Sequence, residues 1–513
     1  MNNAVSLPRD TNQALGIGQF AVDFVAGRLG DGPSAAVLAK TRLLHTDAVL
    51  CGASALALRT NAPTILRNEA LEYADANGAT PLGVATRVKA EKAIVANASA
   101  MREWDSNGTN FGYNPALGHT AGEFGHNDFY SVAIAACQQE NLDGATALKA
   151  MVLLDEIRGR LAEVFSLKSY RIDHVVHGAI ASAATYGALM GANAEQIESA
   201  IGMFVAHYIP WRAIRAGKQL SDSKGASAAI STEAAVLSMK RALNGFIGPK
   251  DIFRNPESMF RQFVKTAGDS PFDLVLNHSG DDFAVMGMHF KMGLYEHQSA
   301  GALQGLIDLI AANPGLTEPG QITKILIRAY EPAFGIIGDP AKRDPHTRQS
   351  ADHSMVYIVA TMLRKAIEGR ASLPKTTDGI WQSLMLSPYD YHLDAINHPL
   401  TRQLMETISF EHGGPDYDAK YPDGIPTSVV ITNAAGQAVD SGVVMYPAGH
   451  ARNTTADLNA ILKHKFAMLG ALALPDGSDV LTLVNKLESM EKLGASDLRG
   501  IYAFEIADRP GYE

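Results

Sequence analysis

The sequence contains almost no cysteine. Cys51 and Cys137 are the only two in 513 residues, too few for a disulfide framework or for an iron–sulfur cluster held by three or four thiolates. The pair His174 and His177 in DHVVH lacks the HExxH or cysteine-rich context of a zinc site. The sequence therefore predicts no structural or catalytic metal.

The chain also lacks an excess of basic residues and any long apolar run. Its formal net charge is -10, whereas nucleic acids and anionic membranes bind proteins through basic surfaces. No uninterrupted apolar stretch approaches the roughly 20 residues of a membrane span, and MNNAVSLPRD does not have the basic-then-apolar order of a signal peptide. We therefore expect no nucleic-acid partner, no membrane partner and a cytoplasmic location.

Charged residues are scarce, at 19% of the chain against 46% for hydrophobic residues. That balance is typical of a folded globular protein rather than a disordered one. A chain of 513 residues suggests two or more domains, at roughly 100 to 200 residues each. The low charge fraction also favours burial of part of the surface against another subunit.

Apolar periodicity divides the chain into three segments. Residues 14–275 have a mainly helical pattern, as in VVHGAIASAATYGALMG, and their small side chains predict close helix crossings. Beyond them, QITKILIRAY, ETISFEH and TSVVITNAAGQAVDSGVVMYP predict short strands beside helices. We predict a helical domain over 1–275, an α+β domain over 276–447 and a C-terminal return to the helical domain over 448–513.

A polar, glycine-rich stretch at 101–128 interrupts the helical pattern. Its candidate functional side chains are Asp105, Thr109, His119, His126 and Asp128. A carboxylate, a hydroxyl and imidazoles can transfer protons near neutral pH, and loops longer than about 12 residues inside compact domains are often functional. Turn-forming and capping roles account for Asp105 and Thr109 individually but less well for the whole set.

A second group of candidates surrounds the predicted helix start at SDSKGASAA. Lys224 would lie in the first turn, where an ammonium group and free backbone amides together can bind a carboxylate. Just upstream, His207, Arg212 and Arg215 form a cationic cluster, and arginines bind carboxylates through paired donors. For both, solvated surface charge is the alternative. His297, in LYEHQSAG, is by itself more typical of a structural residue.

Nine segments of the chain, taken together, carry a family resemblance. They are LLHTDAVLCGASALAL, AMREWDSNGT, GHND, DHVVHGAIASAA, SDSKGASAA, FKMGLYEHQSA, ADHSMVYIVATML, HPLTRQLMETI and YPAGHARN. In this order they resemble the 2-methylcitrate dehydratase family, also called MmgE/PrpD, which includes cis-aconitate decarboxylase and an iminodisuccinate epimerase. The resemblance extends over nearly the whole chain and rests on the order of the segments rather than on any one of them.

The resemblance implies a fold and a mode of action. The family has a large helical domain, built from the N-terminal half and the C-terminal tail, with a smaller α+β lid domain inserted between them. That division is similar to the one drawn above from periodicity. Because family members are usually homodimers that act on small polycarboxylates without a metal or an iron–sulfur cluster, we expect a mainly α protein with an inserted lid, a homodimer, a small polycarboxylate substrate and no cofactor.

The resemblance also assigns roles to positions of this chain. Asp105 and Thr109 match the family's D-x-x-D-T element, in which Gly108 here replaces the second Asp and so removes one possible base or orienting carboxylate. The family's next histidine is best matched by His126, with His119 as the alternative created by a longer loop.

Matches elsewhere extend the predicted site. They are Lys224 for the family's active-site lysine, Arg212 and Arg215 for its paired arginines, His174 for a pocket histidine, His297 for the lid histidine and Arg402 for the arginine of an HP-x-x-R-like helix start. The predicted catalytic residues are Asp105, His126, Lys224 and His297, and the predicted substrate-binding residues are Thr109, His174, His207, Arg212, Arg215 and Arg402.

The resemblance and these residues together predict dehydration of 2-methylcitrate or a similar β-hydroxy tricarboxylate. A base removes the proton beside a carboxylate, cationic donors stabilise the aci-carboxylate, and a general acid assists the departure of hydroxide. In this hypothesis Lys224 and the two arginines hold carboxylates, His126 and Asp105 handle one proton, and His297 handles the other.

Three alternatives remain at this point. A cis-aconitate-type decarboxylase and an iminodisuccinate-type epimerase could use the same pocket, because each forms a carbanion beside a carboxylate. A non-catalytic polycarboxylate-binding protein is the third, and Gly108 is the feature that favours it.

Overall fold

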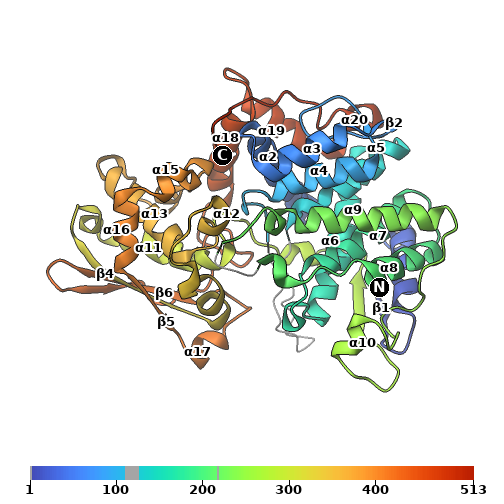
Figure 1. Ribbon diagram of the computed structural model, residues 1–513, viewed down its shortest axis with the longest axis horizontal. Helices are drawn as coiled ribbons and strands as arrows, with labels where there is room; N and C mark the ends of the chain where they lie inside the picture. Colours follow the sequence, from blue (N-terminus) through green and yellow to red (C-terminus); the bar gives the residue numbers. More distant parts are fainter. Residues whose placement is uncertain (1–2, 110–125, 216–218, 513) are drawn as a thin grey trace.

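The computed structural model describes residues 3–109, 126–215 and 219–512. Their backbone is mostly helical and holds one two-stranded and one four-stranded sheet. In the N-terminal half the helices are α1 (Gln13–Val25), α2 (Ala35–Ala57), α3 (Asn61–Leu71), α4 (Ala90–Arg102), α5 (Ser131–Glu140), α6 (Gly144–Val164), α7 (Val175–Leu189), α8 (Ala194–His207), α9 (Ser223–Leu243) and α10 (Met259–Phe263). Strand β2 is Ala74–Ala79, and β1 (Ala4–Leu7) pairs antiparallel with β3 (Leu274–Asn277). Figure 1 shows these helices gathered at one end of the molecule.

Close packing of small residues positions the site-bearing ends of these helices. Helix α9 packs against α4, α7 and α8, and in the second half of α2 Cys51 and the alanines at 48, 53, 55 and 57 are fully buried. At Gly178 in α7, a Cβ atom would lie 2.1 Å from the ring of Phe129. The missing side chain lets the short turn Asn127–Tyr130 pack onto α7, which fixes His126 just before it.

The second half contains the four-stranded sheet. Its strands are β4 (Ile322–Ala329), β5 (Ile408–His412), β6 (Thr427–Asn433) and β7 (Ala438–Asp440), in the order β5-β4-β6-β7. Strand β4 is parallel to β5 and antiparallel to β6, and β6 and β7 form the predicted hairpin. The predicted strands of this half are therefore confirmed.

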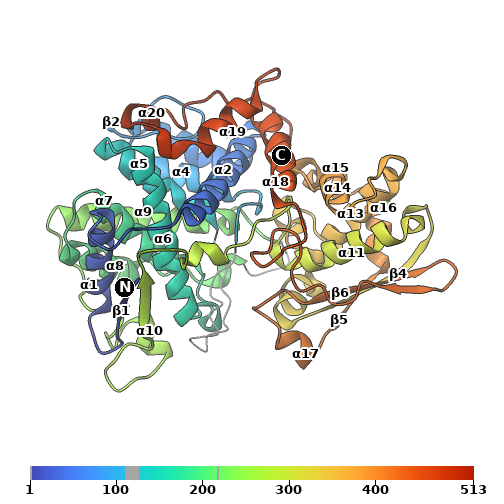
Figure 2. The same ribbon diagram turned by 180° about the vertical axis from the view of Figure 1, so that it is seen from behind.

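Helices cover one face of this sheet, as both views show (Figures 1 and 2). The helices of this half are α11 (Ala300–Ala312), α12 (Arg348–Ala351), α13 (Met355–Glu368), α14 (Thr377–Leu384), α15 (Leu393–Ile396), α16 (Pro399–Thr407) and α17 (Pro415–Asp418). Ile325, Ile327 and Ala329 alternate along β4 as fully buried residues, which is the pattern of a strand with one covered face. Helix α11 packs against β6, and α16 against β4.

The C-terminal helices α18 (Leu458–Ala473), α19 (Val480–Glu488) and α20 (Ala495–Arg499) return to the N-terminal half. Helices α18 and α19 pack against α2, and α20 against α5. From α18, the buried Lys465 donates hydrogen bonds to the backbone carbonyls of Ser106, at 2.7 Å, and Lys291, at 2.9 Å. The tail therefore helps to hold the segment that carries Asp105, while the exact domain boundaries stay predictions.

Two expectations about the chain as a whole can be compared with the structure. Among the described residues, no helix combines the length and the apolar character needed to cross a bilayer. Cys51 and Cys137 are both buried and unpaired. Burial raises the pKa of each thiol to about 12, so neither is poised as a thiolate nucleophile.

Candidate active site

Asp105 is the centre of the site and follows directly after α4. Its backbone has φ of 50°, in the left-handed region where Asp and Asn are among the better tolerated residues. Its buried Oδ1 contacts Arg102 Nη1 at 2.5 Å and Lys291 Nζ at 2.5 Å. Lys291 also donates to the Asp105 carbonyl at 2.6 Å, so this residue is held through both its main chain and its side chain.

Cations determine the charge of Asp105. Burial alone would raise the pKa of the carboxyl, but Arg102, Lys291 and Lys224 outweigh it and hold the pKa well below the usual range. Lys224 Nζ lies 3.9 Å from Oδ2. Asp105 is therefore a permanent anion at neutral pH and is better suited to organising charge than to carrying a proton.

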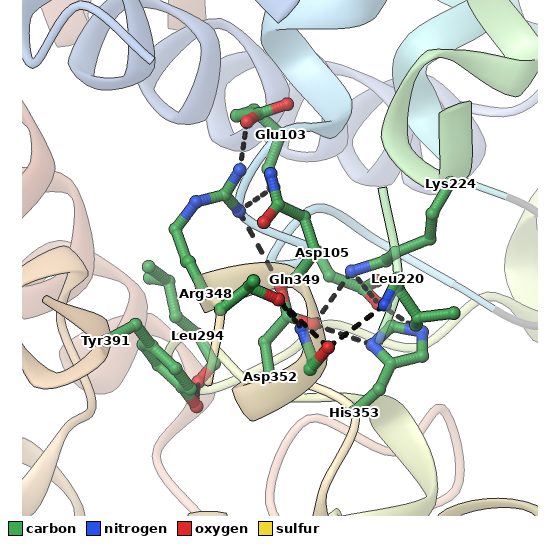
Figure 3. Close-up of polar contacts among 12 residues, drawn as sticks. Glu103, Asp105, Leu220, Lys224, Leu294, Arg348, Gln349, Asp352, His353 and Tyr391 are labelled. Carbon is green, nitrogen blue, oxygen red and sulfur yellow. Dashed lines mark hydrogen bonds and ion pairs between the residues drawn. The ribbon is translucent and has the colours of Figure 1, made fainter. Parts of the chain in front are cut away.

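Lys224 lies in the first turn of α9, as predicted, and is almost completely buried. Its Nζ donates to Asp352 Oδ1 at 2.7 Å. Burial lowers the pKa of this ammonium group, and Asp352 and Asp105 oppose that shift. Lys224 thus joins two carboxylates that come from distant parts of the chain (Figure 3).

Asp352 and His353 enter the site from the short connection between α12 and α13. Ser354 caps α13 by accepting a hydrogen bond from the Tyr357 amide, which fixes where that connection ends. His353 Nδ1 lies 2.7 Å from Asp352 Oδ1, and Nε2 lies 3.4 Å from Asp105 Oδ2. Burial and the charge of Lys224 lower the pKa of His353 to about 3, against the pull of Asp352.

Arg348 joins α12 to the segment after α4. Its guanidinium pairs with the Glu103 carboxylate and donates to the Glu103 carbonyl at 3.0 Å. It also lies over the Trp104 ring, 5.2 Å from the centroid, and 3.7 Å from Asp352 Oδ2. Figure 3 shows this side chain bridging the two segments, so Arg348 sets the distance between Asp352 and Asp105.

A pocket opens beside this cluster, and both halves of the chain contribute to it. Its lining residues are Arg102, Asp105, His126, His174, Arg212, Arg215, Glu296, Gln298, Ile336, Lys342 and His353. Cationic side chains predominate in an otherwise acidic protein, which is the local concentration of positive charge that an anionic ligand requires.

One wall of the pocket is formed by two imidazoles. The rings of His126 and His174 meet edge to face, with centroids 5.7 Å apart. Burial lowers the pKa of both, to about 3 for His174 and well below the usual value for His126, so both rings are neutral at pH 7. Beside them Arg215 Nε donates to Asp173 Oδ2 at 2.5 Å, which anchors the short helical turn Arg212–Arg215 to the residue before His174.

Glu296 is the pocket residue whose proton is most easily exchanged near neutral pH. Burial raises its pKa to about 7, Asp105 adds to that shift, and Lys291 opposes it. Its carboxylate accepts a hydrogen bond from the Gln298 amide at 2.7 Å, and its own amide donates to the Asp352 carbonyl at 3.0 Å. The carboxyl group is therefore fixed beside the Asp352–His353 connection.

Six of the ten predicted residues converge on this site. They are Asp105, His126, His174, Arg212 and Arg215, which line the pocket, and Lys224, which contacts Asp105 and Asp352 behind it. His119 lies outside the described residues. The functional roles of these residues stay predictions.

The other four predicted residues lie away from the pocket lining. His297 points to His289, with Nε2 3.0 Å from His289 Nδ1. Thr109 is fully buried and pairs through its backbone with His289. His207 is exposed at the end of α8. Arg402 folds back onto the Ile396 carbonyl and Asp344, each at 2.7 Å.

The structure adds residues to the site that sequence reasoning did not select. They are Arg102, Lys291, Glu296, Lys342, Arg348, Asp352 and His353. Most of them lie in AMREWDSNGT, FKMGLYEHQSA and ADHSMVYIVATML, three of the segments that carry the family resemblance. In the last two segments only His297 had been given a role.

Gly108 lies in a closely packed position. A Cβ atom there would lie 2.3 Å from Asn127 Oδ1 and 2.4 Å from Leu44 Cδ2. Both atoms are the ends of side chains, so a larger residue at this position would require Asn127 and Leu44 to shift. The surrounding packing accounts for the glycine, and the charge of the site comes instead from Asp105 and Asp352.

Asp105, Asp352 and His353 form the one potential metal-ligand group found among the described residues, with ligand atoms within 4.8 Å of one another. Both carboxylates are already paired with buried cations, Lys291 at 2.5 Å and Lys224 at 2.7 Å. A divalent ion would have to approach these ammonium groups in a low-dielectric interior, where like charges repel strongly. The donor set therefore fits an ion-pair network better than a metal centre.

Two family models and several known proteins match this chain. The MmgE/PrpD N-terminal domain matches residues 19–271, and the MmgE/PrpD C-terminal domain matches residues 295–488.

The chain is 26% identical to the mitochondrial 2-methylcitrate dehydratase of Yarrowia lipolytica, over 64% of this chain and 60% of that protein. It is 24% identical to alkylcitrate dehydratase phiI of Fungal sp. (strain ATCC 74256), over 65% and 62%. It is 25% identical to 2-methylcitrate dehydratase of Escherichia coli (strain K12), over 63% of each chain. Each match spans less than two thirds of the relative's own length. Since the two domain matches together span most of the sequence, the chain belongs to the MmgE/PrpD family.

Proposed function

We propose that this protein dehydrates a small β-hydroxy tricarboxylate such as 2-methylcitrate. The observation that carries the proposal is the convergence of Arg102, Arg212, Arg215 and Lys342 on one pocket that also holds neutral imidazoles. Cations of this kind bind carboxylates and stabilise the aci-carboxylate formed when the neighbouring carbon loses a proton. Relatives named 2-methylcitrate dehydratase and alkylcitrate dehydratase support the same substrate class.

The proposed roles differ from the sequence hypothesis at two positions. Asp105 organises the cations rather than transferring a proton, because its carboxyl stays ionised. Glu296 rather than His297 provides the second proton, because Glu296 lines the pocket and His297 is turned toward His289. His126 remains a candidate proton carrier, and the sheet-bearing half, which supplies Glu296, Lys342 and His353, would act as the lid.

The test is a small substrate panel. Methylcitrate, citrate, cis-aconitate and iminodisuccinate are each incubated with the protein while water loss, carbon dioxide release and racemisation are followed. We expect water loss from a β-hydroxy tricarboxylate. Carbon dioxide release alone would instead establish the decarboxylase, and racemisation alone the epimerase. Thermal stabilisation by a polycarboxylate without any turnover would identify a binding protein.

The proposal includes the remaining predictions from the sequence. They are a homodimer, a cytoplasmic location, and catalysis that needs neither a metal nor a cofactor. The homodimer is tested by measuring the mass of the protein in solution. Catalysis without a metal or cofactor is tested by measuring activity after exhaustive dialysis against a chelator.

The pKa of Glu296 predicts an alkaline limit to activity. Burial raises that pKa to about 7, so the acid form is present below pH 7 and is lost as the pH rises through 7. We expect kcat/KM of the wild type to fall about tenfold per pH unit above that value. Glu296→Gln should lower kcat/KM about 100-fold and abolish this limb.

Glu505→Gln, at an exposed position, is the matched control and should reproduce the wild-type profile. An unchanged alkaline limb in Glu296→Gln would assign the second proton to another group.

A further inference from the structure

Among the described residues, His353 is the imidazole that lies between the two buried carboxylates Asp352 and Asp105. Its Nδ1 faces Asp352 Oδ1 at 2.7 Å and its Nε2 faces Asp105 Oδ2 at 3.4 Å, so each ring nitrogen is directed at a different carboxylate. Its side chain is 11% exposed, whereas those of Asp105, Asp352 and Lys224 are 2% exposed. The ring and Asp105 both line the pocket, and the ring is the more exposed of the two; Figure 3 shows how it lies beside Asp352, Asp105 and Lys224.

We propose that His353 is the general base that removes the proton from the substrate carbon, and that Asp352 and Arg348 are positioning residues for it. The inference rests on the proposed function for its substrate class. Nδ1 is closer to Asp352 Oδ1, at 2.7 Å, than Nε2 is to Asp105 Oδ2, at 3.4 Å, so the shorter hydrogen bond runs from Nδ1–H to Asp352 and leaves the lone pair on Nε2. The two carboxylates make the imidazole more basic. Arg348 holds Asp352 from the other side, at 3.7 Å.

The substrate, His353 and Glu296 account for every proton and electron pair in the proposed step. The C–H bond beside a substrate carboxylate breaks, its proton goes to His353 Nε2, and its electron pair moves into the carboxylate to give the aci-carboxylate. That electron pair then forms the carbon–carbon double bond as the adjacent C–O bond breaks. The departing oxygen takes the proton of Glu296 and leaves as water, and the two side chains return to their starting states by exchanging a proton with solvent.

The charges around His353 make its basicity depend on bound substrate. The groups that face it or share its pocket are Asp105, Asp352, Lys224, Arg102, Glu296, Lys342, His126, His174, Arg212 and Arg215. Burial and Lys224 keep the ring neutral. Substrate carboxylates bring negative charge to these cations, so the imidazolium formed by proton transfer becomes more favourable. His353 thus becomes an effective base when a polycarboxylate is bound.

The first experiment measures this dependence directly and does not require turnover. The probe is tricarballylate, a tricarboxylate without a hydroxyl group, added to the full-length protein labelled at histidine Cε1. The NMR signal of His353 is assigned by its absence from His353→Gln. We expect tricarballylate to increase the proton affinity of His353 at least about tenfold. An unchanged proton affinity with tricarballylate bound would overturn the inference even if the protein has no activity on the panel.

The second experiment uses the substrate that the panel identifies. His353→Gln should lower kcat about 100-fold or more, while KM and the tricarballylate Kd stay within about threefold of wild type. Deuterium at the abstracted position should then give its full isotope effect, because proton removal has become limiting. His464→Gln, an exposed histidine on α18, is the control. If the wild type turns the substrate over and the kcat of His353→Gln stays within about tenfold of the wild-type value, the base assignment is refuted and the proposed function remains intact.

Variants at Asp352 separate positioning from folding. Asp352→Asn keeps a hydrogen-bond acceptor but removes the charge, so the pKa of His353 should fall. The acid limb of the kcat profile should move to lower pH, and the plateau should drop about tenfold. Asp352→Glu should recover part of the rate. A lower rate with an unmoved acid limb would show that Asp352 has a purely structural role.

Discussion

Replacing Lys224 with alanine should reduce turnover at least about 1000-fold while the protein stays folded. Lys224 Nζ lies 2.7 Å from Asp352 and 3.9 Å from Asp105, so among the described residues it is the lysine that pairs with both carboxylates. Its removal changes the charge that a substrate carboxylate meets and releases Asp352 from its position beside His353. Steady-state kinetics on the substrate identified by the panel measures the effect.

The same substitution should also cost stability, for a separate reason. It leaves the buried Asp352 without its closest cation, which is expected to lower the free energy of unfolding by about 3 kcal/mol. The double variant Lys224→Met with Asp352→Asn removes both charges and should recover most of that stability without recovering activity. Circular dichroism and thermal unfolding follow the fold.

Lys463→Ala, at an exposed position on the same molecule, controls for the loss of a lysine as such. Near-normal turnover in Lys224→Ala would remove Lys224 from the active site. Loss of activity together with loss of the folded state would be resolved by the double variant, which separates the two effects.

Periodicity was sufficient to predict much of the fold. Strand β4 alternates between covered and less covered positions, and β6 and β7 are joined by a short loop that contains Gly436, so both carry their signal in local sequence. The sequence also predicts a return of the C-terminal tail to the helical domain, where α18 packs against α2. The part that local sequence does not specify is the contact of Lys465 with the carbonyls of Ser106 and Lys291, because it joins segments hundreds of residues apart.

The candidate site also contains some residues that local sequence indicates and others that only the folded structure brings in. Asp105, His126 and Lys224 were found because their segments resemble a family or interrupt a helical pattern. Asp352 and His353 lie at the start of an apolar helix, where polar residues usually serve as caps, and Ser354 does serve as one. Only the approach of that connection to the segment after α4 distinguishes the two residues that contact Asp105 and Lys224 from the capping residue.

His297 lies between two residues that reach the pocket, but its own side chain points elsewhere. Residues His297–Ser299 form a turn of 3-10 helix, in which successive side chains point about 120° apart. Glu296 and Gln298 face the pocket, and His297 between them faces His289. The segment reaches the pocket, but a sequence match could not determine which of its adjacent polar side chains lines it.

Asp105→Asn should be the most damaging substitution for stability. The carboxylate is the shared counter-ion of Arg102 and Lys291, each at 2.5 Å, and lies 3.9 Å from Lys224. Without it these buried cations repel one another, so we expect the free energy of unfolding to fall by about 4 kcal/mol. Asn tolerates the positive φ of this position, so the loss reports charge rather than backbone strain. Activity should be lost with it, because the cations can no longer hold their places around the pocket.

The pH dependence gives this prediction a distinct signature. The pKa of Asp105 is lower in the folded protein than in the unfolded chain, so its contribution to stability is complete above the unfolded value of about 3.9 and is lost as the pH falls through the folded value. The stability difference between wild type and Asp105→Asn should therefore be constant from about pH 5 to 7 and shrink only in strong acid. Lys291→Met combined with Asp105→Asn should recover part of the loss, whereas Asp416→Asn, at an exposed position, should have no effect. If denaturant unfolding at pH 7 gave the same midpoint for Asp105→Asn and wild type, Asp105 would not be the charge that holds these cations together.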